Sequence, residues 1–280
     1  MARFDPRTGT AMFGPVIKGA HDLAVAGGWL WVSGGGVLDY GQPATRFLYR
    51  LDPATLQVLQ RLALPEPPNP LAPTPAGMWV GASEALYLID PATGHIDRTI
   101  SLKMAVGQIS IDEQDGILYD STHPPGDATI QAIEERDPAT GALRLRSNVE
   151  RGALAMNSLA AVPDGVWAAY ATGMMGSVDL FDASNLHRLA VWNGAEMTGT
   201  NGIRADLADG ILWVSDAMTG ALACADPATG AFRALVPRSS VSQYGTSNVV
   251  AVGSAVYTGT LNNGLVRVDP GSRCLGSPYG

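Results

Sequence analysis

Short segments in which apolar and polar residues alternate recur along the whole chain, a two-residue period typical of β-strands with one buried face. Examples are FLYRL at 47–51, ALYLI at 85–89 and LVRV at 265–268. Glycine-led segments with an aromatic residue, such as GGWLWVSG at 27–34, stand upstream of them. The chain is therefore predicted to consist of short strands separated by turns.

An Asp-Pro turn, or a variant of it, follows the alternating segments at near-constant spacing. These repeat turns begin at Asp5, Asp52, Asp90, Asp137, Asp182, Asp226 and Asp269. Six intervals cover the 264 residues between the first and the last aspartate, so the mean period is 44 residues. This is the period of a β-propeller blade. Asp caps its own backbone and Pro presets φ, so we predict turn chemistry here and no catalytic role.

Each repeat supplies four strands: an apolar first (inner) strand, a second strand with Trp or Tyr, a third before the repeat turn and a fourth (outer) after it. We therefore predict an all-β, six-bladed β-propeller of four-stranded antiparallel blades. Residues 1–280 are expected to form one propeller domain. Because seven turns accompany six aromatic segments, residues 1–15 are predicted to supply the outer strand or strands that complete the last blade and close the ring. The alternative is a seventh, incomplete blade.

Composition and charge restrict the function classes. The chain is 46% hydrophobic and 16% charged, with 33 Gly and 19 Pro, which disfavours long helices. A net charge of −8 without a basic cluster argues against a nucleic-acid or membrane partner. No signal peptide is visible, so we expect a cytoplasmic monomer, or a secreted or periplasmic one if a leader was removed. Cys224 and Cys274 are interpreted as unpaired small apolar residues.

Polar residues stand at the start of most first strands, where side chains are predicted to face the central channel. Alignment on the aromatic segments gives His21, Asn69, Gly107, Asn157, Asn201 and Ser247 as equivalents, followed by the further polar residues Asp22, Gln108, Ser158 and Asn248. Amide and carboxylate oxygens can hold a hard cation, a sugar or ordered water. The alternative is a polar channel that binds only water.

Three further residues are candidates for the channel mouth. Asp216 ends the aromatic segment WVSD and leads directly into a loop, His123 lies in STHPPGD, and Tyr170 lies in AAYATGMMG. Packing or surface placement is the alternative for His123 and Tyr170. The chain has no GxSxG, HExxH, Walker or dinucleotide-binding motif. Its four histidines disfavour a three-histidine zinc site.

The segment TGTNGIRADLADGILWVSDAMTGALACADPATG at 198–230 resembles the regucalcin/gluconolactonase-like family of six-bladed propellers and its strictosidine-synthase-like and paraoxonase-like relatives. In that family the Asn that starts a first strand binds a divalent ion, a role the resemblance assigns to Asn201 and Asn157. His21 and Ser247 stand where the family has acidic residues, which leaves Asp22 as the carboxylate. GAHDLAVAGGWLWVSGG at 19–35 also resembles virginiamycin B lyase and NHL-repeat proteins, and IDPATG resembles YVTN-type propellers.

The resemblance implies a small-molecule enzyme that hydrolyses a lactone or ester at the channel mouth. Asn157, Asn201 and Asp22 would hold a divalent cation, Ca²⁺ rather than Zn²⁺, and Asp22, His21 or Asp216 would activate water. The residues expected to bind substrate are Asn69, Gln108, Ser247, Asn248, Tyr170 and His123. The alternatives are a metal-independent strictosidine-synthase-like or lyase-type biosynthetic enzyme and a non-catalytic YVTN/NHL-like binding propeller.

Overall fold

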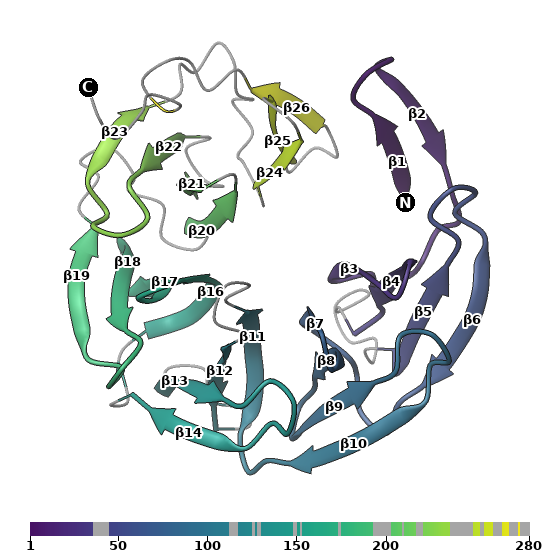
Figure 1. Cartoon of the computed structure of the whole chain (residues 1–280), viewed down its shortest axis with the longest axis horizontal. Helices are drawn as coiled ribbons and strands as arrows, with labels where there is room; N and C mark the ends of the chain where they lie inside the picture. Colours follow the sequence, from purple (N-terminus) through teal and green to yellow (C-terminus); the bar gives the residue numbers. More distant parts are fainter. Residues whose placement is uncertain are drawn as a thin grey trace. The chain divides into compact units, whose positions relative to one another are not determined.

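The computed structural model describes residues 1–35, 45–111, 117–124, 127, 130–147, 150–151, 153–172, 175–192, 203–208, 210–216, 221–235, 249–252, 255–259, 265–268 and 274. All elements in these residues are strands, and the strands of each sheet pair antiparallel (Figure 1). The part of the chain described contains no helix long and apolar enough to cross a membrane. The predicted all-β class is confirmed.

The described strands group into two compact units, and the first comprises Met1–Ile111, Gly116–Gly126 and Arg136–Arg144. It begins with a separate hairpin of β1 (Ala2–Asp5) and β2 (Thr10–Phe13). Its first full sheet contains β3 (Leu23–Ala26), β4 (Trp29–Ser33), β5 (Phe47–Leu51) and β6 (Val58–Ala63). The next contains β7 (Leu71–Thr74), β8 (Gly77–Gly81), β9 (Ala85–Ile89) and β10 (Ile96–Ser101).

The division between the units runs through the following sheet. Its strands are β11 (Ala105–Ile111), β12 (Leu118–His123), β13 (Ile130–Arg136) and β14 (Leu143–Arg146), and β15 (Glu150–Arg151) also pairs with β13. The order β11-β12-β13-β14 repeats the meander of the two preceding sheets.

The second unit comprises Asp112–Asp115, Asp127–Glu135 and Leu145–Gly280. One sheet contains β16 (Ala153–Val162), β17 (Gly165–Thr172), β18 (Met175–Asp182) and β19 (Arg188–Trp192). The next contains β20 (Ile203–Ala208), β21 (Ile211–Asp216), β22 (Leu222–Ala225) and β23 (Phe232–Leu235). The last has three described strands, β24 (Val249–Val252), β25 (Ala255–Gly259) and β26 (Leu265–Val268). Six meandering sheets thus match the six predicted aromatic repeats.

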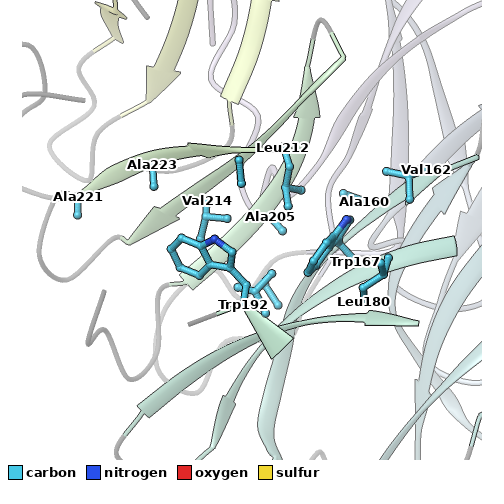
Figure 2. Packing of buried hydrophobic residues seen from close by; sticks show 13 residues of the cluster. Ala160, Val162, Trp167, Leu180, Trp192, Ala205, Leu212, Val214, Ala221 and Ala223 are labelled. Carbon is cyan, nitrogen blue, oxygen red and sulfur yellow. The ribbon is translucent and has the colours of Figure 1, made fainter. Parts of the chain in front are cut away.

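Aromatic side chains of the second strands lie at the centre of the packing. Trp31, Trp79, Trp167 and Trp213 are fully buried. Figure 2 shows one apolar cluster of the second unit, in which Trp167 and neighbouring side chains of its sheet pack with Leu212 and other residues of the sheet β20–β23. Burial of a side chain of this size stabilises the fold by roughly 1.5–3 kcal/mol. Apolar contact therefore holds consecutive sheets of a unit together.

The described repeat turns share one hydrogen-bonded geometry. Oδ1 of Asp137 accepts the N–H groups of Ala139 and Thr140 at 3.0 and 2.8 Å, and the Gly141 N–H donates to the Asp137 carbonyl at 2.7 Å. Gly141 has a φ of 70°, in the region that favours glycine. The predicted turn chemistry is confirmed.

The N-terminal hairpin repeats a third and a fourth strand. β1 pairs with β2 from Ala2↔Phe13 to Asp5↔Thr10, and the Gly9 N–H donates to the Asp5 carbonyl at 2.9 Å, as in the other repeat turns. Among the described strands β1 pairs with β2 alone, whereas β26 is already the third strand of its own sheet. Completion of the last blade by residues 1–15 stays a prediction.

The two cysteines form a disulfide, so their interpretation as unpaired residues was wrong. Cys224 on β22 bonds to Cys274, and the two Cα atoms are 5.8 Å apart. The physical reason is the repeat: 50 residues separate the cysteines, close to one period, so the second cysteine reaches the sheet that precedes its own. The bond attaches the segment after β26 to the sheet β20–β23.

Candidate functional site

His21 and Asp22, two of the predicted catalytic residues, lie together at the start of β3. They line a cavity of about 260 Å³ in the first unit, whose other walls are Met1, Ile17, Ala20, Leu23 and Val32. The cavity walls are mainly apolar, and His21 and Asp22 are the only polar side chains among the wall residues. His21 and Asp22 thus line one cavity, and their catalytic role stays a prediction.

The carboxylate of Asp22 joins two neighbouring sheets. Its Oδ1 accepts the N–H of Leu23 at 2.8 Å, and its Oδ2 accepts the N–H of Leu71 on β7 at 2.9 Å. The Asp22 N–H donates to Oγ of Ser33 at 3.0 Å. Because both carboxylate oxygens accept backbone amides, Asp22 links the first strand of one sheet to that of the next.

On two further first strands, a side-chain oxygen also accepts a backbone amide of the next sheet. In the second unit, Oγ of Ser158 on β16 accepts the N–H of Ala205 on β20 at 2.7 Å. Oδ2 of Asp206 accepts the N–H of Val249 on β24 at 3.1 Å. The three donors Leu71, Ala205 and Val249 are equivalent, because each pairs with the residue that follows the second-strand aromatic.

The remaining predicted residues of the first unit do not gather into one cluster that the described contacts define. Asn69 precedes β7, and its half-buried side chain has an Oδ1 that accepts no hydrogen bond within the part of the chain described. His123 ends β12, and its Nδ1 lies 3.0 Å from the Pro124 carbonyl oxygen. Gln108 is in β11, but its side chain lies outside the described residues.

In the second unit, Tyr170 belongs to a buried polar network and does not face a cavity identified in the described residues. Its hydroxyl donates to the carboxylate of Asp179, which also accepts Nη1 of Arg188 at 3.1 Å and the hydroxyl of Ser177. Asp179 is fully buried, and its hydrogen bond raises the pKa of Arg188. This network joins β17, β18 and β19 into one sheet.

The metal-binding, catalytic and substrate-binding roles predicted for the remaining residues of the second unit stay predictions. Asn157 is half-buried on β16, and Asp216 is fully buried at the end of β21. Asn201, Ser247 and Asn248 lie outside the described residues. Within the ranges that the structure describes, no three His, Cys, Asp or Glu side chains form a group that could hold a metal ion.

Sequence reasoning missed a second role of the repeat turns, as acceptors for the preceding sheet. Nε1 of Trp79 donates to the Pro138 carbonyl at 2.7 Å, and Nε1 of Trp167 donates to the Pro227 carbonyl at 2.7 Å. The arginine guanidiniums at 50 and 98 donate to turn carbonyls in the same way. The recurrence of Trp one repeat before DPATG was the signal in the sequence.

A buried ion pair reinforces the sheet β11–β15. Nε of Arg136 lies 3.1 Å from Oδ2 of Asp120, and both side chains are almost completely buried. The same guanidinium donates from Nη1 to the carbonyl of Gly141 at 3.2 Å. A buried charge of this kind is tolerated because it is paired and hydrogen-bonded. Asp120 and Arg136 are therefore structural residues.

Comparison with known proteins identifies the fold. No protein-family model and no curated protein matches the chain. BamB from Moraxella catarrhalis is 15% identical with a TM-score of 0.59, over 95% of this chain and 75% of that one. The WD40 domain of Neurospora crassa Pan2 is 11% identical with a TM-score of 0.61, over 90% of each chain. The computationally designed Ika8 protein is 14% identical with a TM-score of 0.63, over 89% and 70%.

The chain has a β-propeller fold. The six meandering sheets and the similarity to BamB and to the Pan2 WD40 domain agree on this point. Similarity at such identities extends to the fold alone, because unrelated functions share this architecture. Activity must therefore be argued from the residues themselves.

Proposed function

We propose that the protein is a non-catalytic binding propeller. The observation that supports this proposal is the bonding of Asp22, the residue expected both to bind the metal ion and to activate water. Its carboxylate oxygens accept the amides of Leu23 and Leu71, so its negative charge stabilises the contact between β3 and β7. A carboxylate used for assembly is poorly placed to serve as a general base.

Turnover measurements test this proposal. The purified protein is assayed with a panel of lactones and aryl esters, in Ca²⁺ and in EDTA, and we expect no hydrolysis above the buffer rate. Asp22→Asn should lower Tm, because a neutral amide accepts the Leu71 N–H more weakly. Asp164→Asn, on an exposed turn, is the control. Ca²⁺-dependent turnover that Asp22→Asn abolishes at unchanged Tm would contradict the proposal.

A lactone or ester hydrolase is the second candidate. Its support is the cavity of about 260 Å³ that His21 and Asp22 line together, combined with the regucalcin/gluconolactonase-like pattern around Asn201. In this hypothesis His21 takes a proton from the attacking water, and a divalent cation polarises the carbonyl. His21→Ala would then reduce kcat while leaving Tm unchanged.

We also propose that the protein works in an oxidising compartment, secreted or periplasmic. The support is the disulfide between Cys224 and Cys274, because such bonds persist outside the reducing cytosol. Differential alkylation and mass spectrometry of the protein from its native host would test this. We expect both cysteines to be oxidised, and free thiols at both positions would overturn the proposal.

A further inference from the structure

We draw no further inference here: the strongest candidate, the cavity of about 260 Å³ that His21 and Asp22 line at the start of β3, belongs to the site already described and supports no activity beyond the hydrolase hypothesis stated for it.

Discussion

The indole Nε1 of Trp79 donates a hydrogen bond to the carbonyl oxygen of Pro138 at 2.7 Å. Trp79 lies on the second strand of one sheet, and Pro138 lies in the repeat turn of the next, 59 residues away. The pair Trp167 and Pro227 repeats this bond at the same distance. The aromatic strand and the repeat turn are thus two halves of one contact between consecutive sheets.

Replacement of the indole tests this contact. Trp79→Phe keeps an aromatic ring in the core but leaves the Pro138 carbonyl without its donor, so we expect a loss of about 1–3 kcal/mol in the free energy of unfolding. Urea denaturation measures it. Trp29→Phe, at a partly exposed position, is the control and should cost less. Equal losses in both variants would show that ring size, and not the hydrogen bond, decides the effect.

The glycine of the repeat turn is predicted to serve close packing as well as backbone conformation. Gly141 has a φ of 70° and Gly9 has a φ of 71°, but a Cβ at Gly9 would have no heavy atom within 4 Å. Gly9→Ala should therefore cost about 1 kcal/mol for the left-handed backbone alone. Gly141→Ala should cost about 1–3 kcal/mol more, because its methyl group overlaps the side chain of Ile100 and the ring of Trp79. Similar losses for the two variants by urea denaturation would contradict the packing role.

Reduction of the disulfide should destabilise the second unit. In the chain-entropy account, a bond that closes a loop of this length stabilises the folded state by about 4 kcal/mol. We expect dithiothreitol to lower Tm, and Cys224→Ala with Cys274→Ala to lower it to a similar degree. The double variant should not respond to dithiothreitol. If its Tm also falls in the reductant, the effect on the natural protein has another origin.

The repeat-turn aspartates make stability sensitive to acid. The hydrogen bond from the Thr140 N–H, followed by that from the Thr140 hydroxyl, lowers the pKa of Asp137 to about 2. A lowered pKa in the folded state means that this contribution to stability is complete above the ordinary value of 3.8 and is lost as the pH falls toward 2.

Asp137→Asn tests this pH dependence. The amide oxygen still accepts the turn amides but does not titrate in this range, so the fall in stability between pH 4 and pH 2 should be less steep than in the natural protein. Urea denaturation across this range measures the slope. An unchanged slope would place the acid sensitivity in the other turn aspartates, whose pKa values are also lowered, such as Asp52 and Asp90.

The sequence by itself determined the repeated unit of this protein. The strand alternation, the Asp-Pro turns and the mean period of 44 residues could be predicted from the sequence. They depend on local backbone geometry and on the burial of one strand face, which are set by the types of nearby residues. The six meandering sheets follow from that pattern. The polar residues at the start of the first strands were also singled out from the sequence; His21 and Asp22 of this group line one cavity, and the predicted roles of the group stay predictions.

Only the tertiary structure decided what those residues contact. Asp22 meets Leu71, and Cys224 meets Cys274, at separations of 49 and 50 residues, where a residue or two of register changes the partner. Leu56 and Leu186 occupy the place that glycine takes in the other described repeat turns, and which side chains those glycines face appears only when the rings of neighbouring sheets are seen beside the turns. Contacts between repeats depend on how one sheet packs on the next, and no local pattern encodes that distance.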